Sequence, residues 1–67
     1  MKIIIENETN KILRYGEDVE PNIGEYMIER DIDFSEWKDY EIYFRPIRGT
    51  FKKGDHKKFI EWLEQYD

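Results

Sequence analysis

The sequence contains no cysteine and no alanine, and its 67 residues include a single histidine, a single serine and two prolines. Without cysteine the chain has neither a disulfide framework nor a thiolate metal site, so its stability does not depend on redox state. The lone histidine, His56, has no second histidine or paired nucleophile with which to bind a metal or form a catalytic triad. We therefore expect no enzyme activity, no catalytic residues, no metal and no cofactor.

Long apolar runs are also missing. The opening run Ile3 to Ile5 is far too short for the hydrophobic region of a signal peptide or for a membrane span, and no later apolar run is longer. Together with the absence of cysteine, this predicts a soluble, cytoplasmic protein that does not bind membranes.

Bulky side chains and charge dominate what is present. Charged residues make up 40% of the chain and the mean hydropathy is −0.93, values that lean toward disorder. An aromatic content of 16% and ten isoleucines indicate the opposite. Each large side chain contributes about 1.5–3 kcal/mol when fully buried, so a small set of them is enough to stabilise a short chain. We expect one folded domain over residues 1–67.

The first half of the chain has the pattern of β-strands. Apolar, partly β-branched runs at residues 2–6 and 11–15 are joined by turn-forming residues, which predicts a β-hairpin over residues 1–16. Residues 23–32 fit two patterns. Alternation of apolar residues favours a strand, but helical spacing is also present and the choice between strand and helix stays open.

The second half ends in the clearest helical pattern. Asp33 and Glu36 have the spacing of a capping box, which predicts a helical turn that places Phe34 and Trp37 against the core. A strand region follows at 41–53, in which Ile42 and Phe44 share one face and Pro46 marks an edge or a bulge. Gly54 ends this region, and Asp55 caps a helix over 55–66. The helix residues assigned to the interior are Phe59, Ile60 and Leu63. The expected fold class is α+β: a small antiparallel β-sheet with one C-terminal amphipathic α-helix packed on it.

The opening segment IIIENETNKILRYGE resembles the start of many small proteins that phages and prophages of low-GC bacteria encode, in which an Asn-rich turn joins two strands and the second ends in Tyr-Gly. The resemblance covers about the first sixteen residues. It implies a host-directed accessory or inhibitory protein, or a minor virion component, and it provides no catalytic residues.

Charge is unevenly distributed along the chain. Residues 1–44 contain five Lys or Arg and twelve Asp or Glu, a net charge of −7, whereas residues 45–58 contain six bases and one acid, a net charge of +5. Residues 59–67 add three acids and no base. Because acidic surfaces repel nucleic acid and attract basic protein grooves, this distribution predicts a noncatalytic protein-interaction module.

Two candidate binding surfaces follow from this distribution. For a basic partner the candidates are Glu29, Asp31, Asp33, Glu36 and Trp37. For an acidic partner or phosphate they are Arg45, Arg48, Lys52 and Lys53. The first set suits a protein partner of unknown identity, including an inhibitory role in which carboxylates occupy the positions of phosphates. Two alternatives stay open: a nucleic-acid-binding accessory protein that uses residues 45–58, and a homodimeric structural protein.

Overall fold

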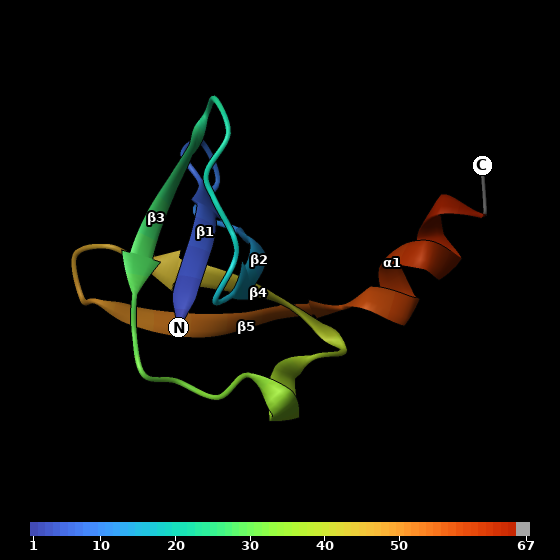
Figure 1. Ribbon diagram of the computed structural model, residues 1–67. Coiled ribbons are helices and arrows are strands. Elements are labelled where there is room, and N and C mark those ends of the chain that lie inside the picture. The colour runs from blue at the N-terminus through green and yellow to red at the C-terminus, as the bar shows by residue number, and fades with distance from the viewer. Residues whose placement is uncertain (66–67) are drawn as a thin grey trace.

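The computed structural model describes residues 1–65, which form two antiparallel sheets followed by a short helix (Figure 1). The elements are β1 (Lys2–Glu6), β2 (Ile12–Gly16), β3 (Glu25–Glu29), the 3₁₀ turn η1 (Ser35–Trp37), β4 (Tyr40–Arg45), β5 (Thr50–His56) and α1 (Lys57–Glu64). One sheet has the strand order β2-β1-β3, and the other is the β4-β5 hairpin. The α+β fold class expected from the sequence is confirmed.

The first sheet is built around β1. Strands β1 and β2 form the expected hairpin, whose turn uses the left-handed conformation of Asn10 at φ 60°. Strand β3 then pairs antiparallel with the other edge of β1, opposing Ile28 to Ile3 and Tyr26 to Ile5. The segment 23–32, for which the sequence left strand and helix open, therefore contains a strand. Alternate residues of β3 lie on the same face of the sheet as the isoleucines of β1 that they oppose, and they extend the apolar surface there.

The core lies between the two sheets and is small. Its buried side chains are Ile3, Ile5, Ile12, Phe34, Ile42 and Phe44. The sheets also meet through their backbones: Lys11 and Tyr43 form an isolated antiparallel bridge, and the Phe44 amide donates to the Asn10 carbonyl at 2.8 Å. The predicted alternation in the second strand region is correct, since Ile42 and Phe44 both point into this core.

The opposite face of β1 is also covered. Ile4 points away from the core cluster yet has no exposed surface. Residues 17–24 join β2 to β3, and this loop passes across the face of the sheet that carries Ile4 (Figure 1). The side chain of Arg14, opposite Ile4 in the β1-β2 pair, holds the loop by donating to the Glu20 carbonyl and to the Glu25 carboxylate. This double coverage explains three consecutive isoleucines in one strand.

The second hairpin extends further than expected. The sequence places a break at Gly54, but β5 continues through it to His56. The register shifts between Tyr40 and Ile42, and a Cβ at position 54 would lie 2.7 Å from Cε2 of Tyr43. Gly54 therefore admits a ring from the neighbouring strand instead of ending β5. Strand β4 stops at Arg45, directly before Pro46, which cannot donate a ladder hydrogen bond.

The segment before β4 makes the expected helical turn. Phe34 is 2% exposed and Trp37 is half-buried against the core cluster. The capping box does not form. Instead, the Asp33 carboxylate accepts from the backbone amide of Ser35 at 2.9 Å, and Phe34 occupies the N-cap position without a side-chain cap.

Helix α1 differs most from expectation. It begins at Lys57, and His56 rather than Asp55 caps it, with Nδ1 accepting from the Lys58 amide at 3.1 Å. The assignment of Phe59 and Leu63 to the interior is wrong, because they are 52% and 48% exposed. The helix continues from the end of β5 and projects away from the strands (Figure 1). Residue 66, the expected end of the helix, lies outside the described residues.

Candidate protein-binding surface

The acidic candidates lie together along the connection between β3 and β4. Glu29 ends β3, Asp31 and Asp33 follow in the irregular segment, and Glu36 lies in η1, all with exposed side chains. The hydrogen bond from the Ser35 backbone amide lowers the pKa of Asp33, so this carboxyl is ionised at neutral pH. Glu29, Asp31, Asp33 and Glu36 are called the acidic connection below.

The acids of the acidic connection differ from Glu25 and Glu41 in that the latter two form ion pairs within the fold. Glu25 lies 2.6 Å from the Arg14 guanidinium, and Glu41 lies 2.9 Å from the Lys11 ammonium. Within residues 1–65, by contrast, no carboxylate of the acidic connection is part of an ion pair. Arg30 is the one cation between them in sequence, and none of the four carboxylates is held in a salt bridge with it or with another described residue, so their charge is presented to solvent.

A shallow apolar hollow adjoins the acidic connection. Its volume is about 350 Å³, and its lining includes Arg30 and Asp31 beside the apolar Ile32, Trp37 and Phe51. The β3-η1 connection and the start of β5 both line this hollow. It therefore forms only when the second hairpin folds back beside the connection. An apolar floor beside unpaired carboxylates suits a side chain with an apolar stem and a cationic end.

The four basic candidates do not share one face, although Arg45 and Arg48 line one hollow of about 420 Å³ at the turn after β4. Arg45 ends β4, Arg48 lies in the following turn, and Lys52 and Lys53 are consecutive in β5. Consecutive strand residues point to opposite faces, and the pairing agrees: Lys52 opposes Tyr43 and Lys53 opposes the buried Ile42.

Both lysines also lie over aromatic rings of their own chain. The Lys52 ammonium is 5.9 Å from the Tyr43 ring centroid, and the Lys53 ammonium is 4.6 Å from that of Tyr40. Such cation–π contacts hold part of the basic charge against the protein itself.

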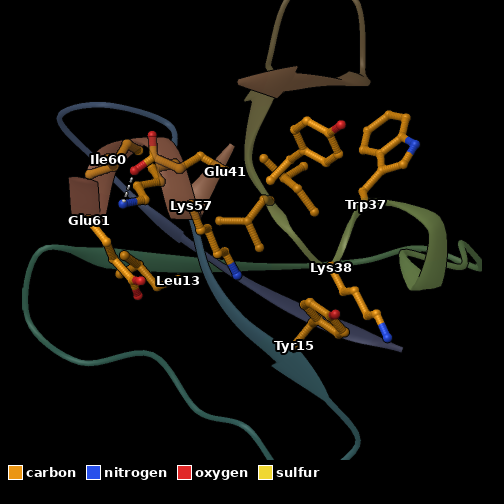
Figure 2. A pocket seen from close by; sticks show the side chains of 12 residues that line it. Leu13, Tyr15, Trp37, Lys38, Glu41, Lys57, Ile60 and Glu61 are labelled. Atoms are coloured by element: carbon orange, nitrogen blue, oxygen red, sulfur yellow. Dashed lines mark hydrogen bonds and ion pairs between the residues drawn. The ribbon is translucent and has the colours of Figure 1, made fainter. Parts of the chain in front are cut away.

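A second cleft, which sequence reasoning missed, lies between β2, η1, β4 and α1. Its volume is about 300 Å³. Figure 2 shows Ile60 and Glu61 of α1 at one end and Trp37 and Lys38 at the other. Leu13 and Tyr15 of β2 also line it and are 38% and 41% exposed. No local pattern could indicate it, because four separate elements form it.

A polar network links the two sheets beside this cleft. The Glu41 carboxylate accepts from the Lys11 ammonium at 2.9 Å and from the Tyr43 hydroxyl at 2.7 Å. The pKa of Glu41 is lowered mainly by the hydrogen bond from Lys11 and, to a smaller extent, by that from the Tyr43 hydroxyl. The hydrogen bond to the Glu41 carboxylate in turn raises the pKa of Tyr43. Because Lys11 and Glu41 are 30 residues apart, no sequence spacing identifies this pair.

Stability should depend on pH through the two paired acids. The pKa values of Glu25 and Glu41 are lowered below the ordinary value of 4.5. A carboxyl with a lowered folded-state pKa contributes stability that is complete above its unfolded pKa and lost as pH falls through the folded one. We therefore expect the urea midpoint to fall as pH decreases from about 5 toward 3. The double variant Glu25→Gln with Glu41→Gln should show a flatter dependence; an unchanged slope would contradict the assignment.

Comparisons with known proteins add no assignment: no protein-family model matches the chain, and neither a curated protein nor a solved structure does. Within residues 1–65 no helix has the length and apolar character required to cross a membrane. In the same part of the chain, no three His, Cys, Asp or Glu side chains come together as a metal site would require.

Proposed function

We propose that this protein is a noncatalytic protein-interaction module that binds a basic partner protein through the acidic connection and the adjoining hollow. The observation that carries the proposal is the contrast in ion pairing: Glu25 and Glu41 are paired within the fold, whereas the four acids of the acidic connection have no cationic partner in residues 1–65. We place this activity in the cytoplasm, where a chain without cysteine loses no stabilising disulfide.

Charge steering supports the proposal. Exposed, unpaired carboxylates attract a basic surface over roughly a Debye length of about 8–10 Å at physiological salt and accelerate encounter. A cationic groove of a nucleic-acid-binding protein is one surface of this chemistry, and a module that occupied it would act as an inhibitor. Such a role agrees with the host-directed function that the resemblance of the opening hairpin implies.

The hollow supports specificity. Trp37 and Asp31 both line it, so an aromatic ring and a carboxylate are present in the same hollow. An arginine from the partner fits this combination, since its guanidinium stacks on aromatic faces and forms paired hydrogen bonds with carboxylates. Trp37 is then the anchor of the surface, and the carboxylates surround it.

Nucleic-acid binding through residues 45–58 is the less favoured function. Lys52 and Lys53 point to opposite faces of the hairpin, so they cannot both follow one phosphate backbone. Each also lies over a tyrosine ring of the same chain.

Neutralising the acidic connection should weaken binding to a basic probe. We propose a triple variant, Glu29→Gln, Asp31→Asn and Glu36→Gln, that retains Asp33 because of its hydrogen bond to Ser35. Binding to a fluorescent arginine-rich peptide should weaken about tenfold at low salt, since exposed charge pairs contribute about 0.2–1 kcal/mol each and 1.4 kcal/mol corresponds to a factor of ten. Fluorescence anisotropy measures the change.

A matched control tests whether position or net charge matters. The variant Glu8→Gln, Asp18→Asn and Glu20→Gln removes the same charge from exposed residues of the other loops. It should bind the peptide with nearly the affinity of the unmodified protein. Equal weakening in both triple variants would mean that only net charge acts, and the proposed site would then be wrong.

A further inference from the structure

Strand β3 forms an open edge of the first sheet. It pairs with β1 on one side, and within residues 1–65 no strand pairs with its other side (Figure 1). An open edge presents backbone N–H and C=O groups at the spacing that an added strand requires. Whether a second chain can use this edge depends on what these groups already contact.

The hydrogen-bond pattern identifies the groups that point outward. The Arg30 amide donates to the Met1 carbonyl at 3.1 Å, so these two residues form a hydrogen-bonded pair of the β1-β3 ladder. Such pairs alternate along an antiparallel ladder with pairs whose backbone groups point away from each other. The even-numbered residues of β3 therefore bond to β1. The odd-numbered residues, Glu25, Met27 and Glu29, direct their N–H and C=O groups away from it.

Some of these outward groups already have partners. The Glu25 amide donates to the Asn22 carbonyl at 3.1 Å, and the Glu29 carbonyl accepts from the Arg30 guanidinium at 2.8 Å. The Glu25 carbonyl, both backbone groups of Met27 and the Glu29 amide have no hydrogen-bond partner among the described residues. These remaining groups follow one another along the edge, so a single added strand can pair with all of them.

We propose that an extended basic segment of the partner protein adds to β3 as an antiparallel strand, an inference that rests on the function proposed above. Glu29 ends β3 and begins the acidic connection, so a segment on this edge continues toward Asp31. Lys2 of β1 opposes Glu29 but forms no salt bridge with it in the described part of the chain. An arginine of the added strand directly opposite Glu29 forms a cross-strand pair of opposite charge.

A second copy of this chain fits the same edge less well. Antiparallel pairing of β3 with β3 about a two-fold axis at Met27 places Glu25 of each copy opposite Glu29 of the other, and like charges directly opposite destabilise a strand pair. Arg14 already holds Glu25, which moderates this repulsion, but the pairing brings no cation to Glu29. The charge of the edge therefore favours a basic segment over the chain itself.

Backbone methylation of a probe peptide tests the pairing. The probe is a fluorescent peptide of alternating arginine and threonine, whose arginines share one face when it is extended. In an antiparallel pair centred on Met27, the peptide residues with side chains on the Glu29 face also direct their N–H groups toward β3. N-methylation of the arginines should therefore weaken binding about tenfold or more in fluorescence anisotropy. N-methylation of the threonines keeps the same charge and should change the affinity by less than about threefold.

Two variants place the pairing on β3. Met27→Pro removes the outward amide and retains the β1-β3 ladder, because residue 27 does not donate to β1. It should bind the unmethylated peptide about tenfold more weakly. Met27→Thr is the matched control, since it changes the same side chain and keeps the amide, and its affinity should stay within about twofold of the unmodified protein. Circular dichroism checks that both variants fold.

Hydrogen exchange in the unmodified protein gives a readout that needs no variant. The Met27 and Glu29 amides should become protected when the peptide binds, whereas the Tyr26 and Ile28 amides already donate to β1 and should change little. Equal affinities of the two methylated peptides, or a Met27 amide that stays unprotected in the complex, would overturn the proposal.

These results separate strand addition from the function on which it rests. If methylation has no effect but the triple variant of the acidic connection still binds the peptide more weakly, the acidic connection acts without strand addition. If that triple variant binds as tightly as the unmodified protein, the proposed function itself is wrong.

Discussion

Replacing Phe34 with alanine is expected to lower the free energy of unfolding by about 3–5 kcal/mol, which is comparable to the whole stability of a small domain. Phe34 is 2% exposed and joins both sheets. Its ring lies 5.0 Å from that of Tyr15 in β2 and 5.2 Å from that of Phe51 in β5, measured between centroids. Truncation therefore removes the aromatic contacts that Phe34 makes with both sheets and leaves a cavity in the core.

Urea unfolding followed by tryptophan fluorescence measures this loss. Ile47→Ala is the control, because that isoleucine is fully exposed in the turn between β4 and β5 and its truncation should change stability by less than about 0.5 kcal/mol. A Phe34→Ala protein that unfolds within about 1 kcal/mol of the unmodified protein would show that the 3₁₀ segment does not hold the sheets together.

Replacing Gly54 with alanine is expected to cost about 1–3 kcal/mol through overpacking. The new Cβ would lie 2.7 Å from Cε2 of Tyr43 and 3.3 Å from the Glu41 carbonyl oxygen. The ring cannot withdraw freely, because its hydroxyl donates to the Glu41 carboxylate and the Lys52 ammonium lies over its face.

A double-mutant cycle isolates the cause of this loss. In a Tyr43→Ala background the ring is absent, so Gly54→Ala should cost less than half as much as in the unmodified protein. Equal costs in the two backgrounds would show that strand propensity at position 54, and not the ring contact, requires glycine.

The sequence predicted the elements whose signals come from neighbouring residues. The hairpin of β1 and β2 follows from apolar runs and a turn in which Asn10 takes a left-handed conformation. The alternation of Ile42 and Phe44 correctly identified the buried face of β4. These features need only neighbouring residues, and their spacing is visible in the sequence.

Features that depend on distant contacts could not be predicted in this way. From the sequence, Gly54 appeared to end a strand. Its actual role is to leave space for the ring of Tyr43, and this contact is invisible in the sequence because Tyr43 belongs to the neighbouring strand. Phe59 and Leu63 appeared to be core because amphipathic helices usually pack their apolar side inward, whereas here only Ile60 of the three residues assigned to the interior lines the cleft.

The candidate binding surface was partly predictable. The acids of the connection are near each other in sequence, and in the structure they lie between the end of β3 and the turn η1 with exposed side chains. The opposed directions of Lys52 and Lys53 also follow from adjacency within a strand, once the strand is known to include both. The hollow beside Trp37 requires residues from β5 and has no sequence signal.

The most direct test of the central claim is affinity capture from a lysate of a low-GC bacterium, with and without nuclease, using three baits: the unmodified protein, the acidic-connection triple variant and the matched loop triple variant. We predict that one basic protein of the lysate is retained after nuclease treatment by the unmodified and loop-variant baits, is released by high salt, and is not retained by the acidic-connection variant. Capture that disappears with nuclease, or that all three baits retain equally, would contradict the account.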